Sequence, residues 1–255
     1  MSLLAGHKIM KTCAIFAVCA MTLGGCTEFP PMDRTPDGIL DPFESQNRKV
    51  HAFNKGLDET VIRPASKAYA TVVPSEFRAL FNNASRNLSM PSVAANSVLQ
   101  GDFKGAAIAT SRFLMNSTLG LAGLFDPATE FQIAPHSTDF GETLAVWGAP
   151  QGAFIELPLL GPSSERAAWG KAVDAITDPL GNVFDPSEKA LRSTAQALAG
   201  LNSRDKFGST IDSVLYDSAD SYAQARLMYL QNRQFELVEG AATNAGDPYE
   251  DPYAQ

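Results

Sequence analysis

His136 and the residues that follow it come closest in type to a hydrolytic site. Ser137, Thr138 and Asp139 directly follow the imidazole, so a base, two hydroxyls and a carboxylate occur together. A Ser-His-Asp triad is a spatial arrangement of separate segments, and neighbours in sequence do not form one. The stretch APHSTDFG is more typical of a loop in which Thr138 or Asp139 caps the next helix. Because the chain also has no P-loop, G-x-S-x-G or H-E-x-x-H pattern, we expect no enzyme activity.

The first 25 residues have the pattern of a secretory signal peptide. Lys8 and Lys11 supply a positive start, and residues 12–23 (TCAIFAVCAMTL) form an apolar segment of signal-peptide length. This segment is shorter than the roughly 20 residues that a transmembrane helix needs. We therefore expect residues 1–25 to be removed, and Cys13 and Cys19 with them.

Cys26, in the stretch MTLGGCTEFPP, has three candidate roles: a disulfide, a metal ligand or a lipid anchor. Without Cys13 and Cys19 it has no partner for an internal disulfide. Only His51 and His136 remain as histidines, so we expect no metal site. The residues LGGC resemble the bacterial lipobox, in which the cysteine receives diacylglycerol and a further acyl chain. The alternative is an ordinary secreted protein with a free thiol.

Charge and composition exclude two classes of binding partner and indicate three segments in the mature chain. The formal net charge is −8, which argues against a nucleic-acid binder and against docking on anionic headgroups by charge alone. Residues 26–40 are predicted to be a lipidated tether, because prolines and polar residues dominate them. Residues 41–240 form one folded domain, and residues 241–255 are predicted to be a disordered acidic tail.

The folded domain is predicted to be all-α. Asp-Pro pairs occur at positions 41, 126, 178 and 185, and we expect at least the first to start a helix. Helical periodicity and breaker residues predict helices over 41–59, 74–90, 91–100, 104–119, 141–147, from 164 onward, 187–201 and 209–239. Extended loops are expected between the helix at 141–147 and Ser164, whose hydroxyl is predicted to cap the next helix.

The first of these helices carries amides beside an apolar stripe. Phe43, Phe53 and Leu57 recur with helical spacing, and Asn47 and Asn54 lie near the same face. Buried amides need hydrogen-bond partners. A neighbouring loop is at least as good a candidate for that partner as a ligand.

The most apolar helix, 104–119, bears a stripe of small and then polar residues: Gly105, Ala109, Arg112 and Asn116. A membrane span over 105–124 is disfavoured, because a central arginine costs about 2.5–3.5 kcal/mol. Two interpretations remain. The helix faces lipid or protein on one side and water on the other, or it is a core helix whose arginine pairs with a carboxylate.

Several stretches resemble the MlaA (VacJ) family of outer-membrane lipoproteins. These are DPFESQNRKVHAFNKGLDETVIRP, NSVLQGDFKGAAIATSRFLMNSTLGLAGLFDPA and DFGETLAVWGAPQGAFIELPLLGPSSERAAWG, with weaker likeness in TDPLGNVF and YAQARLMYLQNRQFELVEG. The resemblance covers residues 41–240, behind the lipobox. Residues 187–217 depart most from it. The residue after the cysteine is Thr27 and not Asp, which by resemblance to lipoprotein sorting rules favours the outer membrane over retention in the inner membrane.

The resemblance implies a single ring-like domain of amphipathic helices around a central channel, on the periplasmic face of the outer membrane. It implies removal of mislocalised phospholipids, with a trimeric porin and a soluble periplasmic carrier as partners, and no cofactor beyond the acyl groups on Cys26. Arg112, Asn116, Ala109 and Gly105 then become candidate channel-lining residues, and Gly120 and Gly123 a candidate gate loop. The alternative is a structural or interaction lipoprotein without transport activity.

Overall fold

The computed structural model describes residues 38–181 and 183–244, and this part of the chain is predominantly helical, as the sequence predicts. The signal peptide, Cys26 and most of the tether lie outside the described residues. The last helix reaches Asn244, a few residues into the segment predicted to be a tail, and residues 245–255 again lie outside the description.

The elements follow one another with short connections. In chain order they are α2 Glu44–Leu57, the π-helix η2 Asp58–Ile62, α3 Arg63–Val72, α4 Ser75–Gln100, α5 Phe103–Thr118, α6 Pro127–Glu130, α7 Phe140–Val146, β1 Phe154–Leu157, β2 Gly161–Ser164, α8 Glu165–Thr177, α9 Pro186–Lys206, α10 Gly208–Asp212, the π-helix η3 Ser213–Asp217 and α11 Ser221–Asn244.

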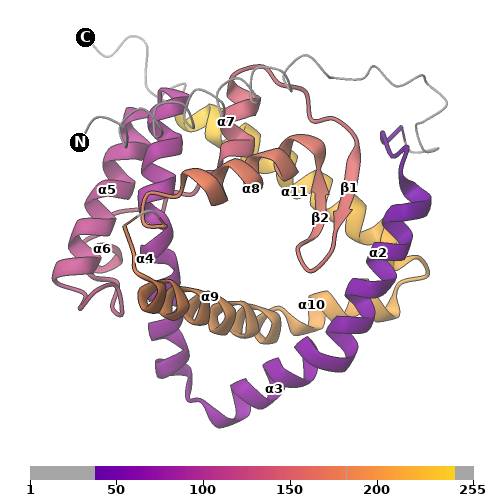
Figure 1. Ribbon diagram of the computed structural model, residues 1–255, viewed down its shortest axis with the longest axis horizontal. Helices are drawn as coiled ribbons and strands as arrows, with labels where there is room; N and C mark the ends of the chain where they lie inside the picture. Colours follow the sequence, from indigo (N-terminus) through magenta and orange to yellow (C-terminus); the bar gives the residue numbers. More distant parts are fainter. Residues whose placement is uncertain (1–37, 182, 245–255) are drawn as a thin grey trace, which may run out of the picture.

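These elements are arranged as a ring (Figure 1). Helices α2, α3, α4, α9 and α10 make up one part of it, and α8 and α11 complete it beside α7. Helices α5 and α6 lie on the outer side of α4, and α5 packs along α4. The hairpin β1–β2 points inward from the ring. The ring-like helical fold is therefore confirmed.

Helix α4 corrects one predicted boundary. Pro91 does not start a new helix but lies inside α4, which runs without interruption from Ser75 to Gln100. A proline inside a helix removes one backbone hydrogen bond and strains the preceding turn. Here α4 packs on both α5 and α9, and this tertiary packing outweighs the local cost. The helix ends at Gly101, whose φ of 79° is the left-handed conformation that glycine adopts most easily.

The Asp-Pro pairs have three different roles. Asp126 and Asp185 cap α6 and α9 through their side chains, with proline in the first turn. Asp178 instead ends α8. The prediction that Asp41 starts the first helix is wrong, because α2 begins after Phe43 without a side-chain cap. The carboxylate of Asp41 is buried and binds Arg226 instead.

The middle and the C-terminal part differ in detail from the expectation. Ser164 caps α8 as predicted, but the loop before it contains the antiparallel hairpin, in which Phe154 is opposite Ser164. The single helix predicted over 209–239 is broken. Ser218 adopts an extended conformation, and the carboxylate of Asp220 accepts a hydrogen bond from the N–H of Ala223, so a new helix, α11, starts there.

Candidate functional site

The stripe on α5 lies on the buried face of the helix. Ala109 is fully buried, and Arg112 and Asn116 are only 6% and 5% exposed. Gly105 leaves no room for a side chain, because a Cβ there would collide with the carboxylate of Asp102. The four residues that the sequence groups together therefore do share one face, and that face points into the protein.

Arg112 forms an ion pair with Asp126, the residue that caps α6. Its Nη2 lies 2.9 and 2.7 Å from the two carboxylate oxygens. Asn116 donates to the same carboxylate at 2.9 Å and accepts from the N–H of Ala128 at 3.1 Å. Burial alone raises the pKa of Asp126, but hydrogen bonds from Thr129 and Asn116 and the charge of Arg112 outweigh it. The pKa therefore lies below its usual 3.8.

These contacts correct the expectation that the α5 stripe lines a water-filled channel. The segment after α5 folds back over the stripe and places the N-terminus of α6 against it. A buried guanidinium needs a charged partner, and the fold provides one in Asp126. The structure instead agrees with the second interpretation of this helix, a core helix whose arginine pairs with a carboxylate.

The glycine-rich loop between α5 and α6 is closely packed. A Cβ at Gly120 would collide with two backbone carbonyl oxygens, and one at Gly123 would lie 2.5 Å from the side-chain nitrogen of Asn87. Gly123 has a φ of 89°, and its non-glycine neighbours Leu121 and Ala122 also have positive φ values of 51° and 59°. Left-handed backbone at consecutive residues is strained. Whether this loop moves as a gate stays a prediction.

His136 contacts a hydroxyl and a carboxylate, but not in the geometry of a triad. Ser97 Oγ lies 3.1 Å from Nε2, and Asp102 Oδ2 lies 3.4 Å from the same nitrogen. In a triad the nucleophile and the carboxylate bind opposite nitrogens of the ring. The contacts among these three residues join α4, the start of α5 and the loop between α6 and α7. Asp139 caps α7, as the sequence predicts.

His51 lies between two parts of the chain that are distant in sequence. Its Nε2 is 3.0 Å from the hydroxyl of Ser221 on α11, and its Nδ1 is 3.5 Å from a carboxylate oxygen of Glu156 on β1. These two contacts link α2 to α11 and to β1. Within residues 38–181 and 183–244, no group of three or more His, Cys, Asp or Glu is placed to hold a metal ion.

The two asparagines of α2 hold the β-hairpin. Asn47 donates to the carbonyl of Phe154 and accepts from the N–H of Glu156, both at 3.0 Å. Asn54 accepts from the N–H of Leu159 at 2.8 Å, at the tip of the hairpin. The interpretation that a neighbouring loop satisfies these amides is thus confirmed.

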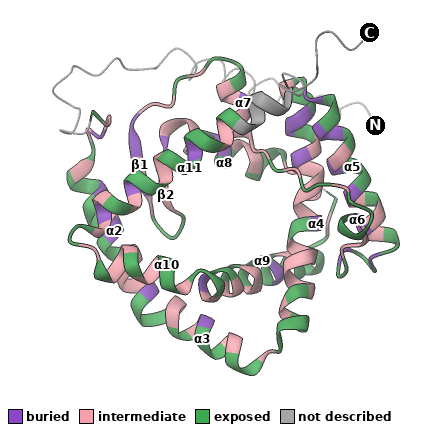
Figure 2. Ribbon diagram, turned by 180° about the vertical axis from the view of Figure 1, so that it is seen from behind, coloured by how far each residue is buried: buried purple, intermediate pink, exposed green. Residues whose placement is uncertain are grey.

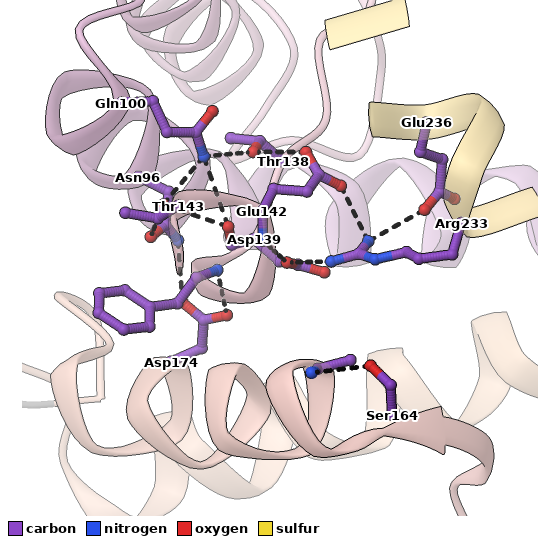
Figure 3. A network of polar contacts seen from close by, with 12 residues as sticks. Asn96, Gln100, Thr138, Asp139, Glu142, Thr143, Ser164, Asp174, Arg233 and Glu236 are labelled. Carbon is purple, nitrogen blue, oxygen red and sulfur yellow. Dashed lines mark hydrogen bonds and ion pairs between the residues drawn. The ribbon is translucent and has the colours of Figure 1, made fainter. Parts of the chain in front are cut away.

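Arg233 fastens α11 to the start of α7 (Figure 3). It donates to Asp139 at 2.6 Å and to Glu142 and Glu236 at 2.9 Å each. Burial raises the pKa of Glu142 despite the nearby guanidinium. The C-terminal helix is therefore held to the rest of the ring by charged groups.

Polar and apolar residues are distributed in the reverse of the usual order. Among the described residues, eighteen polar or charged residues are buried, against nine apolar ones. Twenty-seven large apolar side chains are exposed, and Val72, Phe103 and Leu191 are more than 70% exposed. Figure 2 shows exposed and half-buried positions around the whole ring, with buried ones in short stretches. Apolar exposure on this scale marks a surface that meets another protein or a membrane.

Two open cavities lie beside α4. One, of about 300 Å³, is at the junction of α4, α8 and α9. The other, of about 330 Å³, lies between α4 and α9 near the start of α4. Both have charged and polar residues in their walls, including Arg192 in the first and Arg78 in the second.

Across the described ranges, no helix combines the length and the apolar character that crossing a bilayer requires.

The fold is that of a mainly helical, ring-like protein with one small β-hairpin. The sequence model of the MlaA lipoprotein family matches residues 39–236, and the chain belongs to this family.

Individual relatives agree over most of the chain. The intermembrane phospholipid transport system lipoprotein MlaA of Escherichia coli is 30% identical over 224 residues, which are 86% of this chain and 85% of the relative. An uncharacterized protein of Rickettsia bellii is 31% identical over 202 residues, or 77% and 76% of the two chains. A solved structure described as "Structural basis for maintenance of bacterial outer membrane lipid asymmetry" matches with a TM-score of 0.65 and 27% identity. This match covers 77% of this chain and 98% of the chain in the solved structure.

Sequence reasoning misses the carboxylates that complete the buried pairs. Asp126 and Asp41 stand out only as members of Asp-Pro pairs, and Asp58 does not stand out at all. Asp58 accepts two hydrogen bonds from Arg204 and one from Tyr216, each of 2.8 Å. A helix-start signal was thus available for Asp41 and Asp126, but nothing in the sequence named their partners.

Proposed function

We propose that this chain is an outer-membrane lipoprotein that removes mislocalised phospholipids from the outer leaflet and passes them to a periplasmic carrier. This activity maintains the lipid asymmetry of the outer membrane. The observation that carries the proposal is the reversed distribution of side chains, in a ring whose family includes the Escherichia coli phospholipid transport lipoprotein.

The reversed distribution suits a body that sits in lipid. Contact of an apolar side chain with lipid acyl chains carries no free-energy penalty. The same side chain exposed to water favours aggregation. Several contacts between the helices are buried ion pairs, such as Arg112–Asp126 and Arg204–Asp58. A ring of this kind offers a polar route past a lipid headgroup while its outer surface meets the tails. In the proposal, the space enclosed by this ring is the central channel through which the lipid passes.

The anchor of this body is Cys26. In the proposal the leader is removed before Cys26, and the cysteine carries a diacylglycerol and a further acyl chain on the periplasmic face of the outer membrane. Several chains give stable anchoring, whereas a single one binds a bilayer only marginally. The LGGC pattern at residues 23–26 supports this assignment.

A β-barrel porin trimer and a soluble periplasmic lipid carrier are the proposed protein partners. An apolar strip on α11 supports a lateral contact, since Leu227, Phe235 and Val238 recur on one side and are 41%, 63% and 62% exposed. Barrel surfaces within the membrane are apolar, so such a strip can pack against one. The proposal includes no covalent chemistry and no cofactor.

Surface phospholipid in a deletion strain tests the proposal. Cells that lack the gene should expose more phospholipid to phospholipase added from outside, and the wild-type gene should restore the lower level. The alternative, a structural lipoprotein without transport activity, predicts altered envelope integrity with unchanged phospholipid at the cell surface. That second result would reject transport.

A further inference from the structure

The cavity at the junction of α4, α8 and α9 has walls of mixed charge. Asp174 and Asp178 from α8 and Arg192 from α9 line it, together with the hydroxyl groups of Ser89 and Ser92 on α4. Its volume of about 300 Å³ lies at the small end of the range for ligand sites. It is therefore of a size to hold a lipid headgroup rather than a whole lipid.

The cavity lies on the side of α4 that is turned away from α5. Asn87 donates to Ser117 of α5 at 2.9 Å, which fixes the face of α4 that meets α5. Ser89 is two residues further on, about 200° around the helix, and Ser92 and Asn96 share its side. Because α5 lies outside α4 (Figure 1), this face is directed toward the inner side of the ring.

The charges in the walls do not cancel. Asp178 forms an ion pair with Arg192, and Ser92 donates to the same carboxylate at 3.3 Å. Asp174 is bound only by neutral groups among the described residues, the amide of Asn96 at 2.8 Å and the N–H of Phe140 at 3.0 Å. The lining thus carries one net negative charge, which attracts a cation and disfavours an anionic ligand.

The groups in the cavity also have unused hydrogen-bonding capacity. A carboxylate accepts about four hydrogen bonds, and Asp174 accepts two from the described residues. The hydroxyl of Ser89 donates to the carbonyl of Arg86 at 2.7 Å, so its oxygen is left to accept from an ammonium group. The Nε of Arg192 is buried and makes no hydrogen bond within the described part of the chain.

We propose that this cavity binds the headgroup of a zwitterionic, amine-bearing phospholipid, and so prefers it to an anionic one. The ammonium lies between Asp174, Asp178 and the serine hydroxyls, and the phosphate is bound by Arg192. This inference rests on the proposed function and adds a headgroup preference to it.

Lipid retention by the full-length, lipidated protein tests the inference. The protein is reconstituted in vesicles of equimolar phosphatidylethanolamine and phosphatidylglycerol and re-extracted in mild detergent. The retained lipids are then quantified by mass spectrometry. The wild type should retain phosphatidylethanolamine in excess by about threefold, the selectivity expected from one partly solvated charge pair.

Two variants separate the ammonium and phosphate contacts. Ser89→Lys places a tethered ammonium beside the carboxylates and should bring the retained ratio to that of the vesicle. Ser85→Lys, one turn earlier on α4 and outside the cavity lining, is its matched control and should keep the preference.

Arg192→Gln should lower total retention about tenfold, because it removes a charged donor. Arg78→Gln breaks another α4–α9 ion pair, at the second cavity, and should not lower it.

Each other outcome has a defined meaning. Retention of both lipids at the vesicle ratio by the wild type overturns the headgroup preference and leaves the transport proposal intact. Retention of no phospholipid overturns both. In a further arm with free phosphoethanolamine, binding of that compound without any diacyl lipid would assign the cavity to a soluble metabolite and contradict the lipid assignment. An equal loss in the Ser85→Lys or Arg78→Gln controls would attribute the effects to the fold.

Discussion

The guanidinium of Arg226 on α11 lies 2.6 Å from the carboxylate of Asp41, 185 residues earlier in the chain. Both side chains are almost completely buried. Tyr222 and Asn47 also donate to this carboxylate, at 2.5 and 3.0 Å. The two ends of the folded domain are therefore joined by one buried ion pair that closes the ring beside the hairpin.

Removing one partner of this pair should open the ring. Asp41→Ala removes the buried carboxylate that pairs with the guanidinium of Arg226, and breaking a buried pair costs about 3–5 kcal/mol. We expect that loss in the free energy of unfolding, measured by urea titration in detergent. Arg48→Ala is the matched control, because Arg48 also joins α2 to the start of α11, through Asp220, with both side chains about 40% exposed. Exposed pairs contribute about 0–1 kcal/mol, and equal losses in the two variants would contradict the assignment.

Asn54 should determine how firmly the tip of the hairpin is held. Its amide donates to the carbonyl of Leu157 at 2.9 Å and accepts from the N–H of Leu159, a residue with a φ of 67°. Asn54→Ala removes these two hydrogen bonds and a longer one to Glu156 at 3.3 Å, and we expect the Leu159 amide to exchange with solvent deuterium about tenfold faster. Asn83→Ala removes one hydrogen bond to Leu124, in another loop, and should leave that rate unchanged. An unchanged rate in Asn54→Ala would show that the hairpin holds itself.

The sequence predicts the helices of this ring well and their ends less well. Strong periodicity and capping residues identify α5, α7 and α9, because these signals are local. The uninterrupted α4 and the break before α11 depend on packing against other helices and on Asp220, so local rules fail there. Long-range partners such as Asp41 and Arg226 cannot be read from either residue's neighbours.

The burial of the first helix shows why an apolar stripe misleads in this protein. Periodicity on α2 predicts a core face that includes Phe43 and Phe53, but these residues are 41% and 56% exposed. Asn47 and His51 are buried instead. In water the apolar face of a helix turns inward. In the proposed lipid environment that preference is absent, and polar contacts decide which face packs.

The stability contributed by Asp126 should depend on acid. Its pKa is lower in the folded protein than the usual 3.8, so its contribution is fully present above that value. It should disappear as the pH falls below 3.8 through the lower native pKa. We therefore expect the difference in free energy of unfolding between wild type and Asp126→Asn to be large at pH 7 and to shrink below pH 3.8. A difference in free energy of unfolding that does not change with pH would mean that the contribution of Asp126 does not depend on its negative charge.

The mature N-terminus should be an acylated Cys26. Mass spectrometry of the intact protein should give the mass of residues 26–255 plus a diacylglycerol and one further acyl chain. Cys26→Ala should keep the leader or lose the membrane anchor, because no thiol accepts the lipid. An unmodified Cys26, or a start at another residue, would overturn the anchor.

The most direct test of the central claim is the rate at which phospholipid leaves the outer leaflet. An isotope-labelled phospholipid is inserted into that leaflet from outside, and its remaining amount at the cell surface is followed with time by brief phospholipase treatment and mass spectrometry. Cells that make the protein should clear the label several-fold faster than cells without its gene, and Asp41→Ala should lose this advantage in proportion to its loss of folded protein. Equal clearance with and without the protein, at equal envelope integrity, would contradict the transport function.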